Sequence, residues 1–360
     1  MTRSTRDLKR LLYFGLLFPL VALNVWMFGI VLTYFQQLVT LLIVSAILAF
    51  LLDYLVRAFE RMQIPRAIGI IIVLLATVTS LVVVGVTVIP ILIDQSAQLF
   101  KNLPNWLEVG KSHGMALESW VKLRNLPIDL QGFSGRLSGQ IESQSQELAK
   151  QALGFAIGTL SSFVDSMLVI VMAFYMLLYG GQLWNGLIAV LPDPFGKAFS
   201  VALRLNFHNF FLSQFVLASF MTVTLIPVFL ILKVPFALLF ALLIGIAELI
   251  PFIGAALGIG LVTGLVLLQD FWLSVWVGVA ATVLQQIRDN VIAPKLMGDF
   301  TGLNPIWIFV SLLLGLKIAG LLGVFIAVPI AGTVKATIDA LSQQQAMARQ
   351  EDAVGVLDEG

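Results

Sequence analysis

The residue types most able to do chemistry in this chain stand together in the run Glu248-Leu-Ile-Pro251-Phe-Ile-Gly254. A carboxylate, a proline and a glycine here interrupt sequence that is otherwise apolar enough to lie in a membrane. Pro251 has no N–H group and its ring clashes with the carbonyl of Ala247, so a helix must bend or stop there and leave backbone oxygen unpaired. In lipid this would cost several kcal/mol. Such a break is tolerated where it faces protein or a water-filled path, which indicates a solute route.

A second polar group lies in residues 285–294 and consists mainly of side-chain amides. Its neutral members are Gln285, Gln286, Asn290 and Pro294. Because Pro294 cannot donate a hydrogen bond, it frees the carbonyl of Asn290. This carbonyl and the three amides form a set of neutral donors and acceptors. Such a set suits an uncharged hydroxylated solute or a dehydrated cation better than an apolar solute.

The charged residues near these two runs each have a functional and a structural interpretation. Glu248 either exchanges a proton or a cation, or it only caps a broken helix. Arg288 and Asp289 are neighbours, so on a helix they point to different sides and are predicted to be poor partners for each other. One of them could reach Glu248, and an Arg288–Glu248 pair would hold a gate or neutralise the site; the alternative is a cytoplasmic surface position for Arg288. Lys317 could line the path or extend to the membrane interface.

Composition restricts the class of protein that must position these residues. Apolar residues make up 59% of the chain and charged residues 11%, against about 25% charged in soluble domains. There are no cysteines, so thiol catalysis and disulfides are excluded. The two histidines, His113 and His208, lie outside the predicted spans, so we expect no enzyme, no resident metal and no cofactor. The net charge of +1 gives no sign of a nucleic-acid partner.

The apolar stretches predict an all-α polytopic membrane protein with eight hydrophobic segments. Residues 11–52 are long enough for two spans, with a turn within 29–37. The other six segments are residues 67–93, 155–179, 210–232, 235–268, 271–292 and 305–337. Basic residues at the N-terminus and at Arg57, Arg61 and Arg66 place both on the cytoplasmic side of a plasma membrane by the positive-inside rule. Both termini are therefore predicted to be cytoplasmic.

Four regions follow from this pattern. Residues 1–93 hold the first three membrane helices, and residues 94–153 carry interspersed charges that predict a small extracytoplasmic subdomain of amphipathic helices. A loosely ordered loop is the alternative for this second region. Residues 154–337 form the membrane core, and residues 338–360 form a polar cytoplasmic tail.

The core contains two segments, 235–268 and 305–337, that match each other at an offset of 70 residues. Pro235 and Gly245 in the first correspond to Pro305 and Gly315 in the second. Small or helix-breaking residues interrupt each segment midway, so each is either a long kinked helix or a re-entrant helical hairpin. The hairpin interpretation puts Arg288 and Lys295 in the cytoplasm, which the positive-inside rule favours.

Several motifs together carry a resemblance to a known family. They are Asp53-Tyr-Leu to Pro65-Arg66, Leu103-Pro104-Asn105-Trp106, Phe174-Tyr-Met-Leu-Leu178, Ser213-Gln214, Glu248 to Gly254, Gln285 to Gly298, and Gly320-Leu-Leu-Gly323-Val-Phe-Ile-Ala-Val-Pro329. In this order and spacing the chain resembles the autoinducer-2 exporter family, the PerM-like permeases of bacteria, over about residues 11–337.

The resemblance implies a multispan permease that exports small solutes. In some members the solute is autoinducer-2, a quorum-sensing signal, and in others sodium or lithium moves against protons. It also implies a homo-oligomer, such as a pentamer, and adds Gln214 to the solute path. The family commonly has a glutamate where this chain has Arg288. We therefore expect a proton-coupled exporter of a small polar solute in the lipid bilayer, with a cation/proton antiporter and a non-transporting scaffold or receptor as alternatives.

Overall fold

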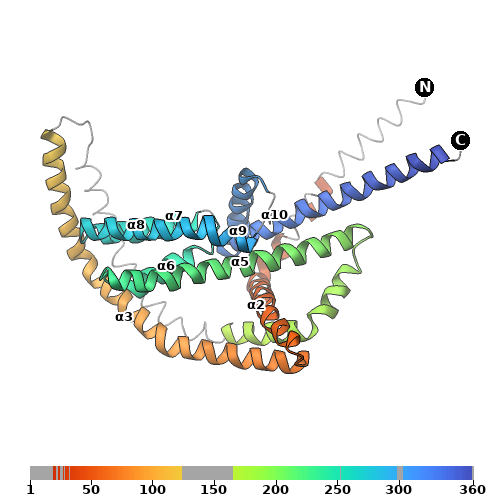
Figure 1. Ribbon diagram of the computed structural model, residues 1–360, viewed down its shortest axis with the longest axis horizontal. Coiled ribbons are helices and arrows are strands. Elements are labelled where there is room, and N and C mark those ends of the chain that lie inside the picture. The colour runs from red at the N-terminus through yellow and green to blue at the C-terminus, as the bar shows by residue number, and fades with distance from the viewer. Residues whose placement is uncertain are drawn as a thin grey trace.

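The computed structural model describes residues 33–123, 165–251, 253–297 and 303–358, with scattered positions between 19 and 31. Over these ranges all regular elements are helical, which confirms the all-α class predicted from the sequence. In chain order the helices are α2 (Gln36–Arg61), α3 (Arg66–Leu123), the helix Asp165–Ile188, α5 (Phe195–Ile231), α6 (Ala237–Ala247), α7 (Gly254–Leu267), α8 (Phe271–Ile287), the π-helix η1 (Arg288–Ile292), α9 (Ala293–Met297) and α10 (Pro305–Asp358) (Figure 1).

Five of these helices are long and apolar enough to cross a membrane. They are Gln36–Arg61, Arg66–Gly110, Asp165–Ile188, Phe195–Ile231 and Pro305–Met347. The chain is therefore a multi-pass membrane protein by the length and composition of its helices. Helices α6 and α7, with 11 and 14 residues, are each shorter than the roughly 20 residues that a span requires. The first predicted span lies mostly outside the described residues.

Helix α3 does not stop where its apolar sequence ends. The third span was predicted to finish at residue 93, but α3 continues through the polar sequence to Leu123. A change from apolar to charged side chains marks a change of surroundings rather than a helix end, because Lys, Glu, Gln and Leu all favour helix. Pro90 and Pro104 lie inside α3, and the helix curves in Figure 1, as expected where proline removes a backbone hydrogen bond. Residues 124–164 lie outside the described ranges.

Ion pairs hold the connection between α2 and α3. Asp53 accepts hydrogen bonds from Arg57 at 2.7 Å and from Arg66 at 2.8 Å, and Arg66 also reaches Glu60 at 3.1 Å. Arg66 is the first residue of α3, so these contacts fix the angle at which α3 leaves α2. The charged residues between the second and third predicted spans therefore form an ordered corner.

Helix α5 lies at the centre of the packed core. It begins at Phe195, directly after the break at Pro192-Asp193-Pro194 that the sequence predicts, and thus 15 residues before the predicted start of this span at residue 210. Its buried side chains pack against α6, α7, α8 and α10. At Gly245 of α6, any side chain would overlap the hydroxyl of Thr222 on α5, so this glycine permits the close contact between the two helices.

The two broken segments both reverse direction. In the first, a Cβ at Gly258 of α7 would lie 3.0 Å from Cβ of Ala247 and 3.1 Å from Cα of Ile244 on α6. In the second, α10 is interrupted at Ala319 and Gly320, where Gly320 has φ +57°, and Gly315 packs directly on Gly323. Residues so far apart along one straight helix could not touch, so each segment folds into an antiparallel helical hairpin. The interruption in α10 lies 70 residues after the turn that follows α6, which matches the predicted repeat.

Candidate functional site

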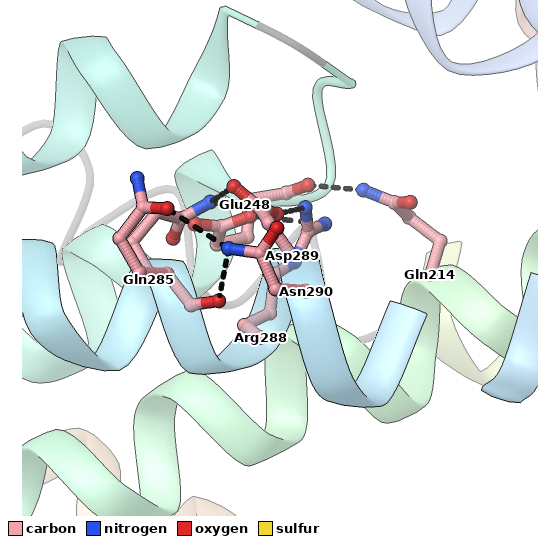
Figure 2. Close-up of polar contacts among 7 residues, drawn as sticks. Gln214, Glu248, Gln285, Arg288, Asp289 and Asn290 are labelled. Atoms are coloured by element: carbon pink, nitrogen blue, oxygen red, sulfur yellow. Dashed lines mark hydrogen bonds and ion pairs between the residues drawn. The ribbon is translucent and has the colours of Figure 1, made fainter. Parts of the chain in front are cut away.

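Glu248 lies in the turn that joins α6 to α7, and only 2% of its surface is exposed. Helix α6 ends at Ala247, as the position of Pro251 predicts. The prediction that the carbonyl of Ala247 is unpaired was wrong, because the N–H of Ile250 donates to it at 2.9 Å within the turn. The carbonyl of Glu248 instead needs a side chain, and the amide of Gln214 on α5 donates to it (Figure 2).

The carboxylate of Glu248 pairs with Arg288, the first residue of η1. One guanidinium nitrogen lies 3.2 Å from Oε2 of Glu248, and another lies 2.6 Å from Oδ1 of Asp289. The side chain of Arg288 is 14% exposed, so the cytoplasmic surface position considered for it is wrong in this structure. The expectation that Arg288 and Asp289 are poor partners was also wrong. The guanidinium group is long and forked, so it spans two carboxylates that point in different directions.

A π-helix positions these charged residues. Residues 288–292 form η1, in which the N–H of Ala293 bonds to the carbonyl of Arg288 five residues earlier. Pro294 follows immediately and has no N–H group, so the ordinary α-helical hydrogen bond to Asn290 cannot form there. Single π-helical turns are rare and occur often at functional sites. The proline singled out in the sequence thus lies at the point where the helix widens.

The amides predicted to form one cluster divide into two groups. Gln285 is buried and donates to both carboxylate oxygens of Asp289, at 3.3 and 3.2 Å, so it joins the Glu248 site. Gln286 and Asn290 are exposed, and the Asn290 amide donates to the side chain and to the carbonyl of Gln286, each at 2.9 Å. These two amides satisfy each other on a different side of the helix.

The structure therefore brings together most, but not all, of the predicted site residues. The residues that meet around the turn are Gln214, Glu248, Gln285, Arg288 and Asp289, with Pro251 and Gly254 in the turn and at its end (Figure 2). Lys317 is exposed and belongs to the other hairpin, next to its break at Ala319. The sequence reasoning missed Ser213, whose hydroxyl donates to the carbonyl of Leu296 on α9 at 3.3 Å.

Three polar atoms of the site are buried without a hydrogen-bond partner among the described residues. They are Oε1 of Glu248, Oε1 of Gln285 and Nε of Arg288. Two acceptor oxygens and one donor of this kind can bind a hydroxyl group, a proton or a small cation. Across the parts of the chain that the structure describes, no group of three or more His, Cys, Asp or Glu side chains could hold a metal ion.

The apolar helices and the buried ion pair in a helix break are features of membrane transport proteins. The comparisons with known proteins show the family: residues 16–343 match the model of the AI-2E family transporters, and the chain belongs to this family.

Its relatives carry names of transport proteins. A protein of Synechocystis provisionally named transport protein sll0063 is 37% identical over 353 residues, which cover 97% of this chain and 89% of the relative. A second Synechocystis protein, sll0060, is 34% identical over 91% of this chain and 95% of its own length. The provisionally named permease PerM of Escherichia coli is 26% identical over 87% of this chain and 90% of its own length. The resemblance to PerM-like permeases is thereby confirmed.

Proposed function

We propose that this protein exports a small polar solute, such as autoinducer-2, across the plasma membrane, and that Glu248 couples the movement to protons. The observation that supports this most directly is the carboxylate of Glu248, buried in the turn of a helical hairpin with one oxygen paired to Arg288 and the other unpaired. A buried carboxylate has a large energetic difference between its two protonation states, so it can exchange protons when a solute or a water path reaches it. Membership of a transporter family supports the class of function.

The solute path in this proposal lies between the turn at residues 248–253 and the end of α8. Polar atoms from α5, α8 and η1 converge there, whereas the surrounding helices present mainly apolar side chains. Hydrogen-bonding groups such as the Gln285 amide would replace water around a hydroxylated solute. The exposed pair of Gln286 and Asn290 would then contact the solute before or after this site.

The two helical hairpins fit a re-entrant arrangement in the bilayer. At about 1.5 Å per residue, α6 and α7 extend roughly 17 and 21 Å, less than a hydrocarbon core of about 30 Å. Each of the two can therefore enter and leave on the same side. In this arrangement α8 crosses inward, and Arg288 and Lys295 lie toward the cytoplasm, as do both termini.

This topology predicts the side on which the segment after α9 lies. Thr301 is outside the described residues, and the chain has no cysteine of its own. A Thr301→Cys variant should react with a membrane-impermeant maleimide only when the reagent reaches the cytoplasmic face, because Lys295 precedes it on that side. Right-side-out and inverted vesicles give the two conditions. Labelling of intact right-side-out vesicles would contradict the re-entrant arrangement.

The lipid bilayer and further copies of the chain are the proposed partners of the apolar outer surface. Large apolar side chains are exposed along several helices, among them Val223 and Ile231 on α5 and Trp272 on α8. A soluble monomer rarely exposes so much apolar area, whereas lipid tails or neighbouring subunits in a homo-oligomer would cover it. A pentamer is the assembly that the sequence resemblance suggests.

Solute flux in proteoliposomes tests the proposed function. We expect the purified protein to accelerate efflux of autoinducer-2 from loaded vesicles, and we expect a pH gradient across the membrane to change the rate because the carboxylate of Glu248 exchanges protons. Empty vesicles and vesicles with a multi-pass protein of another family serve as controls. Flux that is equal to the controls for every polar solute of the panel would favour the scaffold or receptor alternative.

A monovalent cation/proton antiporter is the second candidate. The unpaired oxygens of Glu248 and Gln285 favour it, because hard cations bind oxygen ligands. In the same vesicles, sodium or lithium movement that is coupled to protons, without movement of autoinducer-2, would select this alternative. The positive charge of Arg288 beside Glu248 argues for a neutral or anionic solute.

A further inference from the structure

The hairpin of α6 and α7 receives its N-terminal cap from a distant helix. The N-cap residue of α6 is Phe236, which adopts a left-handed conformation with φ 57° and has no hydrogen-bonding atom in its side chain. The first backbone N–H groups of any helix lack partners within the helix. Here Oε1 of Gln95 on α3, 144 positions away in the sequence, accepts from the N–H of Leu239 in the first turn at 3.0 Å.

Two further contacts join α3 to the same end of the hairpin. The ring of Trp106, which is buried, lies 5.8 Å from the ring of Phe236. Gly110 packs on Leu268, the residue that ends α7, and a Cβ at Gly110 would lie 3.8 Å from Cβ of Leu268. Residues 95–110 of α3 thus hold both the start of α6 and the end of α7, at the base of the hairpin opposite the turn that carries Glu248.

We propose that residues 95–110 of α3 form a fixed clamp on the base of this hairpin, and that Gln95 is a positioning residue for Glu248. The inference deepens the proposed function and rests on it. Helix α6 is held by the clamp at its start and by α5 at Gly245, so it is a rigid arm between the cap and Glu248. Movement during transport is then confined to the turn at residues 248–253, while the base stays in place.

Substitutions at Gln95 test the cap. Gln95→Leu keeps the size of the side chain but removes the acceptor, and Gln95→Glu retains an acceptor oxygen. We expect backbone amides of residues 237–241 to exchange hydrogen about fivefold faster in Gln95→Leu, as for the loss of a helix cap, and Gln95→Glu to restore protection. Gln98→Leu is the matched control, because Gln98 is exposed on the same helix and bonds only to Asp94 in the described contacts, at 2.8 Å.

The pH profile of flux separates positioning from simple support. Gln95→Leu should shift the pH of half-maximal flux and Gln95→Glu should return it toward the original value, since the arm that carries Glu248 is loosened in one and held in the other. Gln98→Leu should leave the profile unchanged. A profile that Gln95→Leu leaves unaltered, or exchange that does not increase near α6, would overturn the role of Gln95.

A disulfide tests whether the clamp is fixed. The predicted Cβ separation of 3.8 Å between positions 110 and 268 matches the mean for disulfides, about 3.8 Å, and the chain contains no other cysteine. Gly110→Cys with Leu268→Cys should oxidise readily, and flux should stay within a factor of about two of the reduced protein. A matched pair, Phe59→Cys with Gly69→Cys at a Cβ separation of 3.5 Å, joins α2 to α3 away from the hairpin.

Flux that falls tenfold or more on oxidation and returns on reduction, in the first pair but not in the second, would overturn the proposal, because the base would then have to move. Failure of the first pair to oxidise would also overturn it. Disulfide formation and hydrogen exchange need no substrate, so they judge the clamp even if the unsubstituted protein carries no solute in vesicles. Absence of flux in that protein would instead count against the proposed function.

Discussion

Replacing Glu248 by glutamine should abolish the pH dependence of solute flux while the oligomer still assembles. Glutamine has nearly the size of glutamate and retains an oxygen toward Arg288, but it cannot bind or release a proton. Flux measured over a series of pH values in vesicles, with assembly checked by size-exclusion chromatography, tests this outcome. Flux that keeps its original pH dependence in Glu248→Gln would rule out the coupling role.

Two control variants separate coupling from charge pairing. Asp289→Asn removes the other carboxylate that contacts Arg288, but Asp289 is 42% exposed, so its loss should leave the pH dependence in place. Arg288→Gln leaves the buried carboxylate of Glu248 without its positive partner, and we expect it to lower the free energy of unfolding by about 3–5 kcal/mol. The double variant Glu248→Gln with Arg288→Gln should recover much of this loss, because both charges are then removed.

A methyl group at Gly254 should disrupt the site more strongly than any other single methyl group in α7. The Cβ of Gly254→Ala would overlap the carbonyl oxygen of Ala247, so the turn would have to open and displace Glu248. We expect flux to be lost and the free energy of unfolding to fall by about 3 kcal/mol, the upper part of the range for overpacking. Thermal unfolding in detergent and flux in vesicles measure the two effects.

Gly264→Ala is the matched control for this change. Gly264 lies on the same helix, and no described atom outside its immediate surroundings lies within 4 Å of the position that its Cβ would take. Alanine is favoured over glycine inside a helix by roughly 0.5–1 kcal/mol, so this variant should be equally or more stable and should transport normally. Equal behaviour of the two variants would show that the close approach at Gly254 is not required.

Proline and glycine let the sequence predict where the helices break. Pro251 and the Pro192-Asp193-Pro194 stretch act on their own backbone, so the ends of α6 and the start of α5 could be located before any contact was known. The repeat of Pro235 and Pro305 likewise located the reversal in α10. Apolar length predicted the membrane class for a similar reason, because each span must bury its own backbone polar groups.

Local reasoning failed where a polar boundary or a neighbouring residue was taken as decisive. The charges after residue 93 did not end α3, since they change only which surroundings the helix meets. Arg288 and Asp289 were judged by the ideal helical angle between them, but η1 replaces the ideal helix and the guanidinium group reaches both carboxylates.

The sequence by itself determined the all-helical membrane class, the turn at Pro251 and the candidate residues on either side of it. Only the tertiary structure decided which of these residues meet. Gln214 reaches Glu248 across 34 positions and Gln95 reaches Leu239 across 144, and neither pair has a spacing or a motif that marks it. Such contacts depend on how α3, α5 and the hairpin pack against one another. Helix breaks are properties of a few adjacent residues, whereas the partner of a buried polar group is a property of the packed chain.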